Sequence, residues 1–394
     1  MSELPPDFTL LQVVPKLDIG GAEQTTLDVA TAVTRAGGRA IVASAGGRMA
    51  PILAQSGAEL AVMPVHAKNP LIMIANAREL ARLIRREKVS LVHVRSRAPA
   101  FSALWAARRT RTPIVATYHG VYSAGGPLKR WYNGVMTRGD RVIANSDFTG
   151  AHLLAEHPIN PARVTVIPRG VDMARFDPAV VGEDRVRALR ERWGLEADDG
   201  RVKLLLAGRL TRWKGQGVAI EALARLKAQG AGEAVLILVG DSQGRDAYVA
   251  ELEARIRALG LRDQVRLPGP CSDMPAAYLT CDIALAPSIE PEAFGRTAVE
   301  PQAMGKPVIA ADHGAARETV VPGQTGWLAA PGDVEAWTQA LAEAIAAGPE
   351  RRSAMGQTAM ARARRLYSVQ AMTDATLDVY RSMLEASHER ATRT

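Results

Sequence analysis

Two glutamates eight positions apart, Glu292 and Glu300, are the strongest candidates in this chain for holding a polar ligand. An apolar run at 283–287 precedes them and a second one, at 307–311, follows them. This order predicts a strand, a loop that carries acids, a helix and another strand, and ligands of such units bind at the carboxyl ends of the strands. Carboxylates are good acceptors for the vicinal hydroxyls of a sugar. If the residues between them were helical, the two acids would be separated along the axis by about 12 Å.

Pro301 follows Glu300 directly and lacks the backbone N–H that a helix interior uses. The helix is therefore expected to start late or to kink at this point. Glu292 has a second interpretation, because an acid at the entrance of a helix also interacts favourably with the helix dipole.

Two cations, Arg209 and Lys214, lie five positions apart in the loop after the apolar run 202–207. Arginine offers a planar fork to phosphate oxygens and lysine a compact point charge. Exposed basic loop residues are usually just solvated, but the predicted place of this pair at the carboxyl end of a strand favours an anion site.

The segment PKLDIGGAEQT, which contains Gly20 and Gly21, follows the first apolar run. A glycine pair lets the backbone approach a ligand, and a helix starting near Ala22 would point free N–H groups at a diphosphate. The Gly-x-Gly-x-x-Gly dinucleotide spacing is absent, and ordinary strand–helix turns use glycine too. His119 directly follows the run 114–117, where it could bind a ligand hydroxyl or serve as a structural histidine.

Short apolar runs alternate with helical patterns along the chain, which predicts a parallel α/β architecture with two successive doubly wound sheets. The predicted strands are Thr9–Val14, Ala40–Ala43, Leu60–Pro64, Leu91–Val94, Ile114–Thr117, Arg141–Ala144 and Val164–Ile167 in the first half, and Val202–Ala207, Ala234–Val239, Val265–Leu267, Ile283–Ala286 and Pro307–Ala310 in the second. The clearest predicted helices are Glu23–Arg35, Ile74–Glu87, Val218–Lys227, Tyr248–Ala258 and Val369–Ala386.

The length of 394 residues favours two domains, and hydrophobic and charged contents of 47% and 23% are typical of a globular protein. We expect no signal peptide and no transmembrane helix, because the N-terminus lacks a basic segment with a long apolar core and no apolar run spans a bilayer. Cys271 and Cys281 have no histidine cluster nearby, which suits a reducing cytosol better than a disulfide framework or a metal site.

The net charge of +8 is unevenly distributed. Residues 1–175 hold 22 lysines and arginines against 12 acids, whereas residues 176–394 hold 27 against 29. The basic excess of the first half is compatible with nucleic acid, an anionic membrane, an acidic acceptor or a generally arginine-rich proteome.

With these residues in view, the chain resembles the family-4 glycosyltransferases of the GT-B fold over nearly its whole length. The most specific element is the Glu-x7-Glu stretch with its Phe-Gly pair, and the segments GRL…KG and VGD and the strand-end His119 support it. The resemblance implies two Rossmann-like domains facing across a cleft: an acceptor-binding domain at 1–178 and a nucleotide-sugar domain at 179–368. The C-terminal helix, about 369–394, is implied to pack back on the first domain.

The resemblance also implies roles at matching positions. Arg209 and Lys214 match the pair that binds the donor diphosphate, Glu300 the acid that holds the ribose hydroxyls, and Glu292 the acid near the hydroxyls of the donor sugar. His119 matches the residue near the 6-hydroxyl of that sugar and joins Arg209, Lys214 and Glu292 as the implied catalytic group. The other implied donor-binding residues are Gly20 and Gly21, whose loop reaches over the donor, Gly208, Asp241, and Phe294 and Gly295, whose N–H groups contact the phosphates.

The activity so implied is a retaining transfer of a sugar from a nucleotide sugar, a UDP-sugar rather than a GDP-sugar, to a saccharide or lipid-linked acceptor. The implied pathways are the synthesis of lipopolysaccharide or another cell-surface polysaccharide or glycolipid, in the cytoplasm or at the inner face of the cytoplasmic membrane. No cofactor or divalent metal is implied, and the chain has no Asp-x-Asp triplet. The basic clusters 82–88, 106–112 and 127–131 would suit anionic lipid.

Three other interpretations remain open at this point: a GT-B-like sugar-nucleotide epimerase, a phosphorylase, and a non-catalytic basic binder. An epimerase would convert the donor without an acceptor, and a phosphorylase would need a cofactor lysine for which no motif is visible. A nucleic-acid binder lacks the aromatic interleaving and any recognisable module, so we expect no nucleic-acid partner. Arg169 stands where the family often has asparagine, and Pro301 and Gln302 depart from its usual Glu-Ala-Met-Ala continuation.

Overall fold

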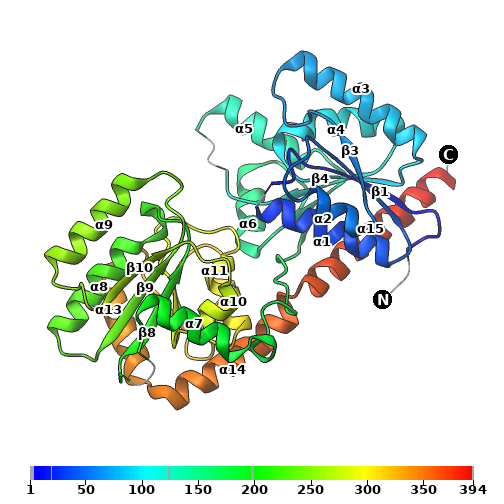
Figure 1. Cartoon of the computed structure of the whole chain (residues 1–394). Helices are drawn as coiled ribbons and strands as arrows, with labels where there is room; N and C mark the ends of the chain where they lie inside the picture. Colours follow the sequence, from blue (N-terminus) through cyan, green and yellow to red (C-terminus); the bar gives the residue numbers. More distant parts are fainter. Residues whose placement is uncertain (1–3, 19, 123–124, 197–198, 393–394) are drawn as a thin grey trace. The chain divides into compact units, whose positions relative to one another are not determined.

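The computed structural model describes residues 4–18, 20–122, 125–196 and 199–392 (Figure 1). The chain divides into two compact units: unit 1 comprises Met1–Gly170 and Val369–Thr394, and unit 2 comprises Val171–Ser368. The division therefore falls shortly before the position 178 that we predicted from sequence. Each unit is a fully parallel sheet with helices on both faces, as the alternation of strands and helices predicts.

The sheet of unit 1 has seven strands in the order β3-β2-β1-β4-β5-β6-β7. Its strands are β1 (Thr9–Val13), β2 (Arg39–Ser44), β3 (Glu59–Val62), β4 (Leu91–Val94), β5 (Ile114–Tyr118), β6 (Arg141–Ala144) and β7 (Val164–Val166). Every residue of the three adjacent strands β1, β4 and β5 is buried, which explains their almost continuous apolar sequences. The order reverses at β1, so the carboxyl ends of β1 and β4 flank the point where ligands of such sheets bind.

The helices of unit 1 are α1 (Gly21–Arg35), α2 (Ala50–Gln55), α3 (Pro70–Arg86), α4 (Arg97–Thr110), α5 (Pro127–Asn133), α6 (Asp147–Glu156) and α15 (Val369–Thr392), with short 3-10 turns η1 (Gly134–Thr137) and η2 (Pro161–Arg163). Helix α3 starts at the proline after Asn69, whose side chain accepts the N–H of Leu71 at 2.9 Å. An asparagine cap followed by proline is a strong start signal, and the sequence prediction missed this first turn.

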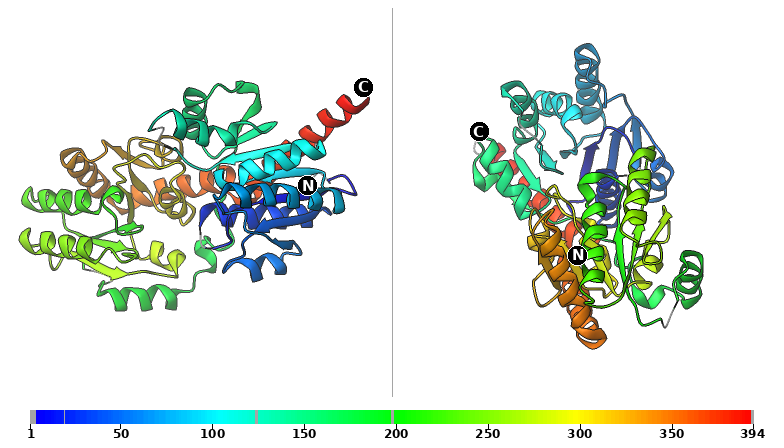
Figure 2. Two further views of the ribbon diagram at one scale, coloured as in Figure 1. Left: turned by 90° about the horizontal axis from the view of Figure 1, so that it is seen from above. Right: turned by 90° about the vertical axis from the view of Figure 1, so that its left-hand side faces the viewer.

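Helix α15 at the end of the chain belongs to unit 1 and packs beside α1 (Figures 1 and 2). Its Tyr380 is fully buried, and the hydroxyl lies 2.5 Å from Nδ1 of His93 in β4. Nε2 of the same imidazole lies 2.6 Å from Oγ1 of Thr117. His93 is thus a structural residue that links the last helix to two strands, and α15 continues past its predicted end at Ala386.

Unit 2 has a six-stranded sheet in the order β10-β9-β8-β11-β12-β13. Its strands are β8 (Val202–Ala207), β9 (Ala234–Val239), β10 (Val265–Gly269), β11 (Ile283–Ala286), β12 (Val308–Ala311) and β13 (Gly326–Ala329). Its helices are α7 (Glu183–Trp193), α8 (Gln216–Ala228), α9 (Asp246–Ala258), α10 (Met274–Leu279), α11 (Arg296–Ala303), α12 (Ala316–Thr319), α13 (Val334–Ala346) and α14 (Gly348–Leu366), with 3-10 turns η3 (Pro178–Val180) and η4 (Arg212–Lys214). All twelve strands predicted from sequence are present, and β13, a four-residue segment that starts with glycine, was missed.

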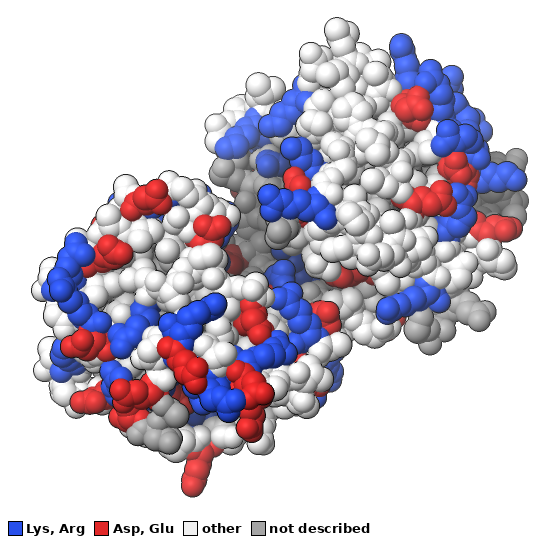
Figure 3. Space-filling model, viewed as in Figure 1, with Lys and Arg blue, Asp and Glu red and all other residues white. Residues whose placement is uncertain are grey.

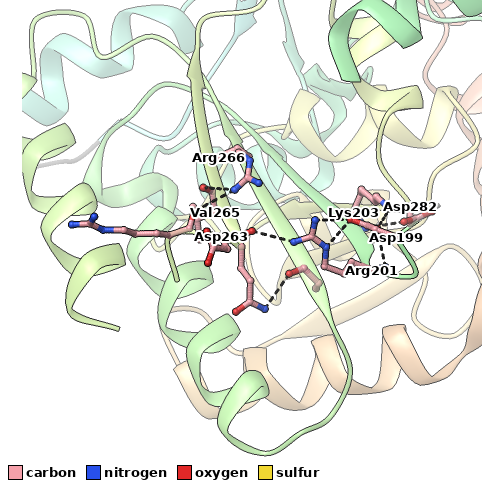
Figure 4. Close-up of polar contacts among 10 residues, drawn as sticks. Asp199, Arg201, Lys203, Asp263, Val265, Arg266 and Asp282 are labelled. Atoms are coloured by element: carbon pink, nitrogen blue, oxygen red, sulfur yellow. Dashed lines mark hydrogen bonds and ion pairs between the residues drawn. The ribbon is translucent and has the colours of Figure 1, made fainter. Parts of the chain in front are cut away.

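A cluster of charged residues lies at the amino ends of strands β8 and β11 in unit 2 (Figure 4). The carboxylate of Asp199 lies 2.6 Å from the side chains of both Arg201 and Lys203, and that of Asp282 accepts the N–H of Lys203 at 2.7 Å. Burial opposes ionisation of Asp199, but the hydrogen bonds from Lys203 and Arg201 outweigh it and lower its pKa to about 2. These charges lie at the edge of the sheet opposite to the strand ends where ligands bind, so they serve stability.

Replacing Asp199 with asparagine is expected to destabilise unit 2 by about 2 kcal/mol at neutral pH, because an unfolded aspartate has a pKa of about 3.9. A depressed pKa stabilises the folded state above the unfolded value and loses its effect as pH falls. The difference between wild type and variant should therefore shrink between about pH 4 and pH 2. Urea unfolding of the wild type and the variant at several pH values measures this difference in the free energy of unfolding. Asp263→Asn is the matched control, since Asp263 joins the cluster through its backbone carbonyl; an equal, pH-independent loss in both variants would contradict the assignment.

Candidate functional site

The loops after β8 and β9 in unit 2 lie in direct contact at the carboxyl ends of these strands. A Cβ atom on Gly240 would lie 1.8 Å from the carbonyl oxygen of Gly208, so only glycine fits there. The N–H of Leu210 donates to the carbonyl of Asp241 at 3.0 Å, which fixes the two loops together. The carboxylate of Asp241 is exposed and accepts the N–H of Gln243 at 2.8 Å. Gly208 and Asp241 thus shape this edge of the site through the backbone.

Lys214 and Glu292, which are far apart in sequence, form a partly buried ion pair. The ammonium of Lys214 lies 2.8 Å from Oε1 of Glu292, and only about a tenth of the lysine side chain is exposed. The hydroxyl of Ser288 donates to the same glutamate oxygen. The ammonium also lies 4.5 Å from the centre of the Trp213 ring, a cation–π distance. A cation and an anion from two predicted functional loops are therefore held in one place.

A second close approach brings these two loops together. Gly215 has φ +77°, and a Cβ atom there would lie 1.9 Å from the carbonyl oxygen of Pro287 at the end of β11. The same two loops are also joined by a hydrogen bond, because the N–H of Ile289 donates to the carbonyl of Trp213 at 2.6 Å. The turn η4 therefore packs against the loop that carries Glu292. This packing places the side chain of Lys214 next to the carboxylate of Glu292.

The backbone of Glu292 is held from its other side by the loop after β12. Gly314 has φ +58°, and a Cβ atom there would lie 2.7 Å from the carbonyl oxygen of Glu292. That carbonyl accepts the N–H of Ala315 at 3.0 Å. Nε2 of His313 lies 2.8 Å from the carbonyl oxygen of Ser288, so His313 has a structural role in this loop.

Helix α11 starts at Arg296, after Gly295 in the left-handed conformation with φ +74°. Glu292 is therefore outside the helix, and the estimate of two acids separated by eight helical residues was wrong. The late start was one of the two outcomes expected from Pro301, and the helix runs through this proline to Ala303. Like any helix N-terminus, that of α11 leaves its first N–H groups without acceptors inside the helix. Those groups and the dipole favour an anion in front of the helix.

Glu300 lies on α11 and is 8% exposed. Its carboxylate lies 2.7 Å from the guanidinium of Arg296 and 3.3 Å from the hydroxyl of Tyr278. Burial raises the pKa of Glu300, and Arg296 and Tyr278 oppose that rise. The sequence prediction missed both partners, although the spacing of Arg296 and Glu300 is that of an i,i+4 ion pair.

Two further predicted residues, Phe294 in the loop before α11 and Arg209 in the loop after β8, have different surroundings. Phe294 is buried and packs edge-on against Tyr367 at 5.7 Å, so its side chain anchors the loop before α11. Arg209 is exposed, and its guanidinium lies 5.9 Å from the centre of the Trp213 ring. Gln216 binds the carbonyl of Arg209 through Nε2 at 2.9 Å. Arg209 and Lys214 therefore flank the same tryptophan, which the sequence prediction did not single out.

Three predicted residues, Gly20, Gly21 and His119, belong to unit 1, and the last two lie against Arg169. Gly20 precedes α1 and Gly21 begins it, and a Cβ atom on Gly21 would lie 2.5 Å from a guanidinium nitrogen of Arg169. Another nitrogen of Arg169 lies 3.2 Å from the carbonyl oxygen and 3.3 Å from Nδ1 of His119. Burial, followed by the charges of Arg169 and Arg95, lowers the pKa of His119 well below its usual value, so the imidazole is neutral at pH 7. Arg169, noted from sequence only as a departure from the family pattern, thus links the glycine loop to His119.

No helix in the parts of the chain that the structure describes is long and apolar enough to cross a membrane.

Two family models match the chain: "Glycosyltransferase Family 4" over residues 19–175 and "Glycosyl transferases group 1" over residues 189–362. Among curated proteins, a D-inositol 3-phosphate glycosyltransferase of Xylanimonas cellulosilytica is 35% identical over 249 residues, 62% of this chain and 58% of that protein. A lipopolysaccharide core biosynthesis mannosyltransferase of Rhizobium leguminosarum bv. viciae is 32% identical over 64% of this chain and 66% of its own length. The chain thus spans less than two thirds of these curated relatives.

A crystal structure of a glycosyltransferase from Rickettsia africae matches over 96% of this chain and 99% of its own, with 32% identity and a TM-score of 0.88. This similarity extends through both units, including the parallel sheets whose strand ends carry the residues described above. Fold, family models and near-complete coverage agree, and the chain belongs to glycosyltransferase family 4 and has the GT-B fold.

Proposed function

We propose that this protein is a retaining glycosyltransferase that binds a nucleotide-sugar donor in unit 2 and the acceptor in unit 1. The observation that carries the proposal is the ion pair of Lys214 and Glu292, 2.8 Å apart and largely buried at the carboxyl end of the sheet. Lysine suits a phosphate and glutamate suits sugar hydroxyls, so the pair fits the position where a donor sugar joins its diphosphate.

The donor is proposed to lie along the loops of unit 2. Glu300 would accept the ribose hydroxyls, while Lys214, Arg209 and the N–H groups of Phe294 and Gly295 would bind the diphosphate. Glu292 would then hold hydroxyls of the sugar. We also propose that the donor is a UDP-sugar. Ribose and diphosphate are common to UDP- and GDP-sugars, so the panel of donors described below tests this choice.

The chemical step breaks the bond between the anomeric carbon and the leaving phosphate oxygen, and negative charge develops on that oxygen. Positive groups in a water-poor site stabilise such charge without having to reorganise. The oxygen of the acceptor hydroxyl is proposed to form the new bond to the anomeric carbon on the face from which the phosphate leaves, which gives retention. The proton of that hydroxyl passes to the leaving phosphate oxygen. We assign no nucleophile, and we propose that no divalent metal is needed, so activity should survive EDTA.

The neutral imidazole of His119 and the Gly20–Gly21 loop are proposed to contribute from unit 1. Because Nδ1 of His119 faces the guanidinium of Arg169, which can only donate, the neutral imidazole carries its proton on Nε2 and can donate it to a sugar hydroxyl. We further propose a saccharide or lipid-linked acceptor in lipopolysaccharide or another cell-surface polysaccharide or glycolipid pathway, at the inner face of the cytoplasmic membrane. The relative from lipopolysaccharide core synthesis and the basic excess of the first half of the chain support this choice.

The test is a panel of UDP- and GDP-sugars, scored by thermal shift and by nucleotide release with and without candidate saccharide acceptors. The expected result is stabilisation by one donor, acceptor-dependent release of its nucleoside diphosphate, and a product that keeps the donor's anomeric configuration by NMR. Conversion of the donor sugar without any acceptor would instead show an epimerase, and an inverted product would exclude the retaining mechanism.

The Glu300→Ala variant is expected to bind free UDP about a hundredfold more weakly, if UDP is the nucleotide selected, because two hydrogen bonds to a charged acceptor are lost. In the wild type, the raised pKa of Glu300 means that acidification protonates the carboxylate at a higher pH than usual, and UDP affinity should fall accordingly. The affinity of the Glu300→Ala variant for UDP should not show this fall on acidification. Isothermal titration across pH measures both, and unchanged affinity in the variant would remove Glu300 from the ribose site.

A further inference from the structure

The ion pair of Arg296 and Glu300 on α11 differs from the ion pairs on the surface of unit 2. On the face of unit 2 that Figure 3 shows, acidic and basic side chains are interspersed and open to solvent. Glu300, in contrast, is only 8% exposed, and a guanidinium nitrogen of Arg296 lies 2.7 Å from its Oε1. The side chain of Arg296 keeps 39% of its surface exposed. The pair therefore joins a nearly buried acid to a cation that still reaches solvent.

The order of the two charges along α11 is not the order that stabilises a helix. Arg296 is the first residue of α11, where the helix dipole favours an acid, and Glu300 follows one turn later. Within a helix, an acid that precedes its cation by four residues is also more favourable than the reverse order. The stability of α11 therefore does not explain why a cation stands at this position.

The surroundings of Glu300 make its ionisation depend mainly on Arg296. The hydroxyl of Tyr278 in α10 donates to Oε2 at 3.3 Å, and the charge of Arg175, before η3, acts from further away. Burial is the largest influence and raises the pKa of Glu300, and the charge of Arg296 is the largest influence that lowers it. Burial raises the pKa of Tyr278 well above its usual value, so its hydroxyl is a neutral donor.

The two contacts of the carboxylate leave room for a ribose. Arg296 lies on Oε1 and Tyr278 lies on Oε2, so each oxygen has one protein donor. A carboxylate has about four acceptor positions in all, and one on each oxygen is thus left for the two vicinal hydroxyls of a ribose. A protonated carboxyl group would lose the charge that strengthens both of these hydrogen bonds.

We propose that Arg296 is a positioning residue of the nucleotide site, which holds the carboxylate of Glu300 ionised and leaves one acceptor position on each oxygen for the ribose. Arg296 would thereby set the lower pH limit of nucleotide binding and the preference for ribose over deoxyribose. This role rests on the proposed function, in which Glu300 holds the ribose of the donor. It goes beyond that function because Arg296 acts on the nucleotide through Glu300 and not by contact.

The test is isothermal titration of the full chain with UDP, or with the nucleoside diphosphate that the donor panel selects, from about pH 5.5 to about pH 8.5. An opposite charge at contact distance changes the ionisation equilibrium of a carboxyl group by a factor of about ten or more. Arg296→Gln should therefore bind UDP at least about tenfold more weakly than the wild type at the acidic end, and nearly equally at the alkaline end. Arg296→Lys keeps the positive charge and should restore most of the binding.

The selectivity for ribose gives a second readout that a purely structural arginine would not change. At neutral pH, the preference of Arg296→Gln for UDP over 2′-deoxy-UDP should fall towards that of Glu300→Ala. Thermal melting checks that each variant is folded. An unchanged preference, together with a pH profile like that of the wild type, would overturn the proposal.

A double-substitution cycle tests whether Arg296 acts through Glu300. In the Glu300→Ala background, Arg296→Gln should not weaken UDP binding further at any pH, because no carboxylate is left to hold. An equal loss with and without Glu300 would show direct contact with the nucleotide and overturn the proposal.

Arg317→Gln is the matched control, since Arg317 is an exposed arginine on α12 of the same unit and pairs with Asp312 at 2.8 Å. It should bind UDP like the wild type across the pH range. A loss on acidification equal to that of Arg296→Gln would show a general effect of net charge, and the assignment of Arg296 would then be wrong.

The titration of Glu300 in the free protein separates this inference from the proposed function. Carbon-13 NMR of labelled glutamate carboxyl groups follows it without any ligand, and the Glu300→Ala variant identifies the signal. Arg296→Gln should raise the pKa of Glu300 above its wild-type value. If UDP binds the wild type but the titration is unchanged in Arg296→Gln, the role of Arg296 fails alone. If no nucleoside diphosphate binds the wild type, the proposed function fails, and the role of Arg296 at the nucleotide fails with it.

Discussion

The Lys214→Ala variant should fold and yet lose about a hundred- to a thousandfold in kcat for glycosyl transfer, the loss typical of removing one preorganised group that stabilises a developing anion. Only about a tenth of the Lys214 side chain is exposed, so its charge acts on the leaving phosphate with little screening by water. The substitution also removes the cation 2.8 Å from Glu292 and so weakens the hold on the sugar. Because the charge on the leaving oxygen grows in the transition state, kcat should fall more than donor affinity.

Arg212→Gln is the matched control for this loss. Arg212 lies in the same turn, η4, but it is exposed and pairs with Glu251 on α9. Removing its charge should leave kcat within about twofold, because exposed ion pairs contribute little. Steady-state kinetics with the donor selected by the panel compares the two variants. A Lys214→Ala enzyme with near-normal kcat, or equal losses in both variants, would show that Lys214 is not the cation of the leaving group.

The Glu292→Gln variant should lose at least about a hundredfold in kcat/KM while its affinity for the free nucleoside diphosphate stays near that of the wild type. Glutamine has nearly the same shape as glutamate, so the contacts with Lys214 and Ser288 can persist as hydrogen bonds to an uncharged amide oxygen. The variant lacks the negative charge, however, and therefore holds the sugar hydroxyls less strongly while the ammonium of Lys214 is left without its counter-ion. A free diphosphate has no sugar, so its binding does not report on this interaction.

Glu290→Gln provides the comparison, since Glu290 is exposed and only two residues away. Transfer rates and isothermal titration with the free diphosphate distinguish the two effects. A Glu292→Gln enzyme with full activity would exclude the sugar-holding role. Weaker binding of both the free diphosphate and the intact donor would move Glu292 to the phosphates.

Much of the fold was predictable because both sheets are parallel and covered on both faces. Central strands of such sheets are continuous apolar runs, and β4, β8 and β11 were predicted at their observed boundaries for this reason. β13 was missed because its four residues start with glycine and end before a turn, which gives too short an apolar run for a prediction. The first turn of α3 was missed because its capping asparagine and proline precede the amphipathic pattern.

The sequence by itself determined which loops lie at the carboxyl ends of the strands. Gly208, Asp241 and the stretch from Glu292 to Glu300 lie directly after apolar runs, and in a parallel sheet all such loops lie at one edge. Pro301 also predicted a helix that either begins late or kinks, and the structure shows that α11 begins at Arg296, after Glu292, and runs through the proline. These are properties of short segments, and they need no knowledge of packing.

Only the tertiary structure decided which side chains meet. Lys214 reaches Glu292 because Gly215 allows η4 to press against the carbonyl of Pro287, and Gly314 holds the acid from its other side. Arg169 likewise reaches both Gly21 and His119 from a third segment of unit 1. A sequence pattern describes the order of residues along a strand or helix. Contacts between loops depend on the register of neighbouring strands and on a few close backbone approaches, which no single segment contains.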